Sequence, residues 1–90
     1  MGNFQLIESI RTACDRFDRD EITLSDLQAA IEGSGQALEG VSRGVYTQLH
    51  DYCNALELIE FGRRTEQQQA EGRVVTTQVR DFLCGLEKLR

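Results

Sequence analysis

Proline is absent from the 90-residue chain, so no residue forces a helix to end by removing a backbone donor and clashing with the preceding turn. Long helices are therefore permitted along the whole sequence. Alternating apolar and polar runs of strand length are also missing, as are the dipeptides that favour tight hairpins. These absences argue against a β-sheet and favour an all-α fold.

Long hydrophobic runs are missing too, since no stretch approaches the roughly 20 consecutive apolar residues of a membrane span. Residues 1–10 lack the basic region and the apolar run of a signal peptide. The cysteines Cys14, Cys53 and Cys84 are odd in number and far apart, unlike those of a secreted disulfide scaffold. We therefore expect a protein of the reducing cytoplasm, with no membrane association.

Positive charge is scarce, because ten basic residues face 15 acidic ones and the net charge is −5. Such a surface repels phosphate backbones, so we expect no nucleic-acid partner. Hydrophobic residues make up 40% of the chain and charged residues 28%, which is typical of a folded globular protein. A chain of this length fills one core, so residues 1–90 are expected to form a single helical domain.

Four segments carry apolar residues at three- and four-residue intervals, which gathers each set on one face of a helix. The predicted helices span residues 3–18, 24–39, 43–61 and 66–88. Thr23 and Asp26 have the spacing of a capping box at the start of the second helix, and Thr65 and Gln68 repeat it before the fourth. Short links make consecutive helices antiparallel, so the sequence predicts an antiparallel bundle of four helices.

Several positions within these segments need a specific structural explanation. Gly33 and Gly35 interrupt the second helix at a cost of roughly 1 kcal/mol each, so either this helix is locally weak or the small residues let a neighbour approach closely.

The apolar stripes include Phe4 and Leu89 and place all three cysteines at apolar positions. Free cysteine behaves there as a small hydrophobic residue, so we expect core thiols.

The segment FDRDEITLSDL at residues 17–27 is similar to an EF-hand calcium loop, in which acidic oxygens precede an isoleucine and a final carboxylate. With Asp15 as the first ligand, the third and fifth ligand positions fall on Phe17 and Arg19. Neither supplies a carboxylate, so too few oxygens remain for a hard cation. We expect a charged turn between helices and no calcium site.

A zinc site would need His50 and Cys53 from one helix together with Cys14 and Cys84 from others. Zinc ligands usually come in closely spaced pairs, which the sequence lacks. A cysteine–histidine nucleophile pair would need an electropositive niche, and the one glycine-rich run, residues 33–35, follows a helix and carries no lysine. We therefore expect no metal, no cofactor and no enzymatic activity.

Charge is distributed unevenly along the chain. Residues 26–60 carry six acidic side chains against one basic, whereas residues 61–90 carry six basic against four acidic. These charges either form ordinary solvated helix faces or steer a basic partner that aromatic side chains then anchor. On the second interpretation, the predicted partner-binding residues are Glu32, Glu39, Tyr46, Asp51, Tyr52, Glu57 and Glu60.

Small size, acidic charge, short antiparallel helices and the run ITLSDLQAAIEGSGQALEG through NALELIEF resemble the small helical immunity proteins of bacterial toxin–immunity systems of the contact-dependent inhibition type. The resemblance implies a protein that neutralises a basic nuclease toxin domain through its acidic helices. The competing hypothesis is a homo-oligomeric structural or adaptor protein that dimerises through an exposed helix stripe. A metal-dependent regulator is a third class.

Overall fold

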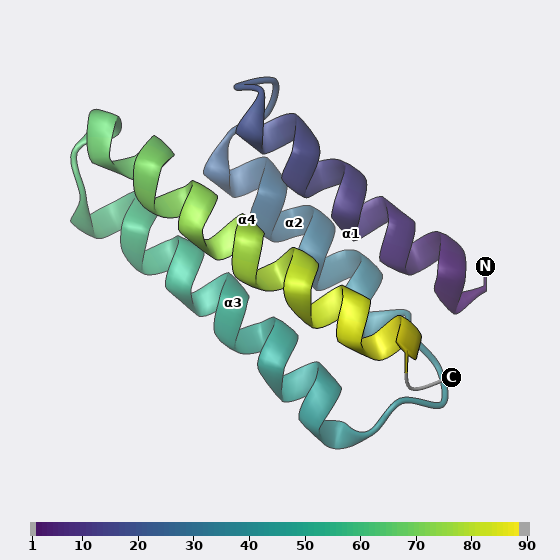
Figure 1. The fold of residues 1–90 in the computed structure, drawn as a ribbon. Coiled ribbons are helices and arrows are strands. Elements are labelled where there is room, and N and C mark those ends of the chain that lie inside the picture. The colour runs from purple at the N-terminus through teal and green to yellow at the C-terminus, as the bar shows by residue number, and fades with distance from the viewer. Residues whose placement is uncertain (1, 89–90) are drawn as a thin grey trace.

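The computed structural model describes residues 2–88, and the polypeptide within that range folds into a bundle of four helices (Figure 1). The helices are α1 (Asn3–Asp18), α2 (Leu24–Gln36), α3 (Arg43–Gly62) and α4 (Thr65–Lys88). Each helix packs on two others, in the cyclic order α1, α2, α3, α4. Consecutive helices run in opposite directions (Figure 1), and no strand occurs among the described residues. The predicted all-α fold is confirmed.

Local side-chain chemistry accounts for the helix boundaries. The capping box at the start of α2 is confirmed, because Asp26 N donates to Thr23 Oγ1 at 3.1 Å and Thr23 N donates to Asp26 Oδ2 at 3.2 Å. The α2 helix ends at Gln36, not at residue 39 as predicted, and the chain turns through Gly40 with a φ of +70°. Such a backbone conformation strains any residue with a Cβ atom, so glycine suits this turn.

The predicted capping box at the start of α4 is wrong. Thr65 is already the first helical residue, and the cap is provided by Gln67, whose side-chain oxygen accepts from Arg64 N at 3.4 Å. The Gln68 amide points back instead, donating to the carbonyl oxygens of Glu60 and Arg63 at 3.0 Å each. The turn between α3 and α4 is thereby tied to both helices.

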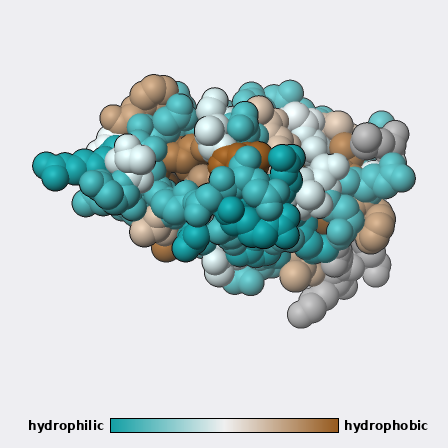
Figure 2. Space-filling model, turned by 90° about the horizontal axis from the view of Figure 1, so that it is seen from above, coloured by the Kyte–Doolittle hydropathy of each residue, from teal (hydrophilic) through white to brown (hydrophobic). Residues whose placement is uncertain are grey.

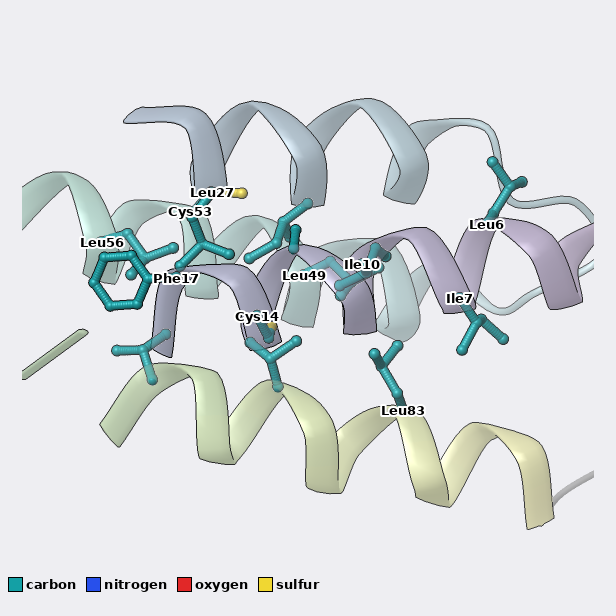
Figure 3. Close-up of a cluster of buried hydrophobic side chains, with 14 of the residues drawn as sticks. Leu6, Ile7, Ile10, Cys14, Phe17, Leu27, Leu49, Cys53, Leu56 and Leu83 are labelled. Carbon is teal, nitrogen blue, oxygen red and sulfur yellow. The ribbon is translucent and has the colours of Figure 1, made fainter. Parts of the chain in front are cut away.

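All four helices contribute to one core between them (Figure 3). The largest fully buried side chains are Ile10, Cys14, Leu27, Ile31, Leu56, Thr76, Val79 and Leu83. Two predicted core positions are wrong: Phe4 is 59% exposed and Cys84 lies on the exposed face of α4. Leu89 lies outside the described residues.

Two glycines allow the helices to approach one another closely. A Cβ atom at Gly35 would lie 3.1 Å from Cδ1 of Leu49, across the contact between α2 and α3. A Cβ atom at Gly72 would lie 2.5 Å from Cζ of the buried Phe17 ring, across the contact between α1 and α4. Since α2 runs unbroken through Gly35, Gly35 serves close packing, whereas a Cβ atom at the exposed Gly33 would meet nothing within 4 Å.

Most of the face seen in Figure 2 is hydrophilic, and hydrophobic side chains show in a hollow near its centre. Charged and polar side chains therefore dominate this face of the surface.

Among the described residues, no helix combines the length and the apolar character that crossing a membrane requires.

Candidate protein-binding surface

Charges are matched where α1 meets α4, a region we call the α1–α4 seam and define by Asp15, Asp18, Arg73, Thr76 and Arg80. Arg80 Nη2 lies 2.6 Å from Asp18 Oδ2, and Arg80 Nη1 lies 3.2 Å from Asp15 Oδ1. The Thr76 hydroxyl, which is fully buried, lies 2.8 Å from Asp18 Oδ1. Arg73 Nη2 donates to the backbone carbonyl of Asp18 at 2.9 Å. Two basic side chains of α4, those of Arg73 and Arg80, are thus directed at α1.

The pKa of Arg80 reflects this pairing. Partial burial by itself would lower the pKa, but the hydrogen bond and the negative charge of Asp18 outweigh burial and raise it above its ordinary value. The guanidinium is therefore charged at neutral pH.

Acidic side chains on and beside α2 and α3 have no such partners among the described residues. In the described part of the chain, each ion pair joins residues of α1, of the turn after it or of the segment 63–80. The acids without a cationic partner there include the five predicted ones, Glu32, Glu39, Asp51, Glu57 and Glu60. Two of them accept hydrogen bonds from neutral amides: Glu60 from Gln28 at 3.0 Å and Glu32 from Gln36 at 3.4 Å. The negative charge of residues 26–60 is therefore not balanced within the described fold.

A groove of about 200 Å³ runs between α2 and α3, and we call it the α2–α3 groove. Its buried lining consists of Ile31, Gly35, Leu49 and Cys53, and its more exposed lining consists of Glu32, Gln36, Tyr46 and His50. The Tyr46 hydroxyl donates to the carbonyl of Leu38, so the phenol oxygen is engaged within the fold. Burial and the nearby Glu32 carboxylate raise the pKa of Cys53 to about 11. The groove is thus apolar at its base and acidic at its edge.

The predicted partner-binding residues do not share one site. Glu32 and Tyr46 line the α2–α3 groove, and Glu60 is linked to α2 through Gln28. Tyr52 instead packs edge-to-face on Phe82 of α4, with ring centroids 5.9 Å apart, so the two tyrosines lie on different sides of α3.

The remaining predicted acids are spread along the surface. Glu39 lies in the loop after α2, where its backbone N donates to Asn3 Oδ1 at 2.9 Å. Asp51 is exposed on α3. Glu57 borders a second hollow on the outer side of the same helix. The acidic side chains therefore form a broad surface with the groove as one part of it.

That second hollow contains the residues that sequence reasoning missed. Leu58 is 73% exposed and Phe61 is 78% exposed, and together with Asn54, Glu57 and Gly62 they line an open depression of about 510 Å³. We call this the outer α3 patch. One sequence signal could have identified them. Leu58 and Phe61 are three residues apart, so they share a helix face, and that face differs from the buried stripe formed by Leu49, Cys53 and Leu56.

The thiols and His50 do not assemble into a metal centre, since the described residues contain no group of three or more His, Cys, Asp or Glu placed to hold an ion. Cys14 lies in the core, where burial, offset in part by Arg80, raises its pKa to about 12. Both buried thiols are therefore protonated and weakly nucleophilic at neutral pH.

Comparisons with protein-family models, curated proteins and solved structures found no match to this chain. Three surface features of α2, α3 and the loop between them bear on a role: the carboxylates without a cationic partner among the described residues, the α2–α3 groove and the outer α3 patch.

Proposed function

We propose that this protein is a protein-binding module that holds a basic protein domain against α2 and α3. One observation carries the proposal: in the described chain, the acids of these helices lack cationic partners, whereas basic side chains of α4 pair with α1. Like charges repel one another in the free protein, and a basic partner relieves that repulsion on binding. The same field accelerates encounter with such a partner.

The biological role that fits best is that of an immunity protein for a nuclease toxin. A nuclease needs a basic surface to bind phosphates, and an acidic protein covering that surface would exclude the substrate. Support comes from the acidic α2–α3 side and from the resemblance in size, charge and helical layout to helical immunity proteins.

The outer α3 patch supplies an apolar contact that could slow dissociation of the partner, which charge alone does not. Electrostatic attraction mainly sets the association rate, while buried aromatic and aliphatic contacts slow dissociation. Phe61 and Leu58 project beside Glu57, so an apolar anchor and a carboxylate are presented together. In this proposal the patch provides the anchoring contact.

The first step of the test is to seek a basic nuclease domain among the products of neighbouring genes. Its association rate with this protein is then measured by stopped flow over a range of salt concentrations. Replacing Glu57 and Glu60 by lysine should slow association at low salt by about tenfold or more and flatten its salt dependence. The matched control replaces Glu66 and Asp81 of α4 by lysine, which changes the net charge equally. If both double variants slow association equally, or if salt has no effect on the wild type, the proposal is wrong.

Exposure of Leu58 and Phe61 also favours the alternative of a homodimer formed through the outer α3 patch. Light scattering coupled to size-exclusion chromatography separates the two. A stable dimer that Phe61→Ser converts to a monomer would support the homodimer, and a monomer at all concentrations would support a heteromeric partner.

A further inference from the structure

The α2–α3 groove has the chemistry of a receptor for one cationic side chain. Its base is apolar, formed by Ile31, Gly35 and Leu49. At its edge the Glu32 carboxylate makes no ion pair within the described residues and accepts one long hydrogen bond, 3.4 Å from Gln36. An occupant that matches both parts needs an apolar stem that ends in a cation.

The dimensions favour a single side chain over a whole small molecule. The groove volume is about 200 Å³, below the roughly 300–1,000 Å³ of pockets that hold drug-sized ligands. Gly35 fixes its base, because a Cβ atom there would lie 3.1 Å from Leu49 Cδ1. The two helices therefore meet below the groove and close it from beneath.

Tyr46 favours arginine over lysine. Its hydroxyl is hydrogen-bonded to the Leu38 carbonyl, so the occupant meets the aromatic ring and not a free donor. Guanidinium groups are planar and weakly hydrated, stack on aromatic rings and pair with carboxylates through two parallel hydrogen bonds, whereas an ammonium is a compact, strongly hydrated charge. Glu32 and Tyr46 line the same groove and so offer both interactions.

We propose that the α2–α3 groove is the subsite for one arginine side chain of the partner, with its stem over Gly35 and Leu49 and its guanidinium paired with Glu32. This inference rests on the proposed function, because it names the group by which the basic partner is recognised. It adds a specific contact to an otherwise diffuse acidic surface.

The cysteines provide an internal reporter of groove occupancy. Cys53 lines the groove and is 8% exposed, Cys14 is fully buried and Cys84 is exposed. An uncharged thiol reagent should modify Cys84 first, Cys53 slowly and Cys14 only on unfolding. An occupant of the groove should slow the labelling of Cys53 without affecting Cys84.

The probe is N-acetyl-argininamide, titrated into the isotopically labelled protein to tens of millimolar, because a ligand of this size binds weakly. Expected are saturable amide shifts centred on Gly35, Leu49 and Cys53, with slower labelling of Cys53. N-acetyl-norleucinamide, which keeps the stem but lacks the cation, should give neither effect. Stronger binding of N-acetyl-lysinamide would contradict the choice of arginine.

Glu32→Gln should weaken the probe by about tenfold or more, since it removes the charge but keeps the shape. Asp81→Asn on α4 is the matched control and should leave binding unchanged. Because Glu32 is exposed, the variant should fold, and continued protection of Cys14 from labelling verifies this. No saturable shift, or equal weakening by both variants, would overturn the subsite.

Failure of the subsite and failure of the proposed function give different results. If a basic partner binds with strong salt dependence while the probe leaves Cys53 unprotected, only the subsite is wrong. If the probe occupies the groove but the association rate with the toxin domain is independent of salt, the subsite stands and the proposed function is wrong.

Discussion

The α1–α4 seam and the α2–α3 side of the bundle differ in how far their charged side chains are paired. At the seam, Arg80 lies within 3.2 Å of both Asp15 and Asp18, and the buried Thr76 hydroxyl lies beside the same carboxylate. On the other side, Glu32 and Glu57 have no cationic partner in the described chain, and Phe61 is 78% exposed. One side therefore pairs its charges within the fold, whereas the other leaves its carboxylates without a cationic partner among the described residues.

The largest expected effect comes from two leucines of α3 that face opposite ways. Leu56 is fully buried, whereas Leu58 is 73% exposed. Leu56→Ala should lower the free energy of unfolding by about 2–5 kcal/mol because it leaves a cavity in the core. Leu58→Ala should change it by less than about 0.5 kcal/mol. Urea unfolding measures both, and a large loss of stability in Leu58→Ala would show that the outer α3 patch serves the fold.

Alkaline pH should destabilise the protein through its two buried thiols. Below pH 9.0, the ordinary thiol pKa, both states are protonated and stability is complete; above it only the unfolded state ionises, because burial raises the folded pKa of Cys53 to about 11 and that of Cys14 to about 12. Stability should therefore fall from pH 9 to pH 11 by up to about 1.4 kcal/mol per pH unit for each thiol.

Cysteine variants assign this loss of stability to the two buried thiols. Cys14→Ala and Cys53→Ala should each flatten the pH dependence of the free energy of unfolding, because each removes one thiol with a raised pKa. Cys84→Ala, at an exposed position, should leave the slope unchanged. Urea titrations at several alkaline pH values measure the slope, and an identical slope in all three variants would contradict the assignment.

Close packing across the seam is tested by two glycines of α4. Gly72→Ala should destabilise the protein by about 1–3 kcal/mol, because the added methyl group would overlap the buried Phe17 ring. Gly85→Ala has open space around it and should stabilise the helix by up to about 1 kcal/mol. Thermal unfolding followed by circular dichroism distinguishes them, and equal midpoints would show that α1 and α4 separate at little cost.

The smallest effect compares one charge from each side. Arg80→Met should cost about 1–2 kcal/mol, because it leaves the half-buried Asp18 carboxylate without its cation. Glu57→Gln should leave stability within about 0.5 kcal/mol of the wild type or raise it slightly at low salt, because it relieves repulsion. Chemical denaturation at two salt concentrations measures both, and a destabilised Glu57→Gln would mean that this acid has a structural partner.

Sequence patterns predicted the helices well because their signals are local. Apolar spacing located α1 to the residue, and the Thr23–Asp26 capping box marked the start of α2. The predictions failed where burial depends on how far a neighbouring helix extends. Phe4 and Cys84 have stripe-like spacing but lie beyond the area that the neighbouring helices cover, and no pattern within one helix reports that limit.

For the candidate site, the sequence identified the acidic character of residues 26–60 but not which side chains share a surface. Tyr46 and Tyr52 lie six residues apart on α3, so helix geometry already directs them to different sides. What only the structure shows is that Tyr52 packs on Phe82, 30 residues away in the chain. Likewise, the sequence shows the basic excess of residues 61–90, but only the structure shows that Arg80 and Arg73 turn toward α1.

The number of helices and their approximate bounds could be predicted from the sequence, because periodicity and capping act over a few residues, and the net negative charge follows from composition. Which charges are neutralised among the described residues became clear only in the folded structure, because charge pairing depends on which helices pack together across the bundle. The folded structure also shows that Gly35 and Leu49 close the base of a groove beside Glu32, since a groove exists only once two helices have packed together.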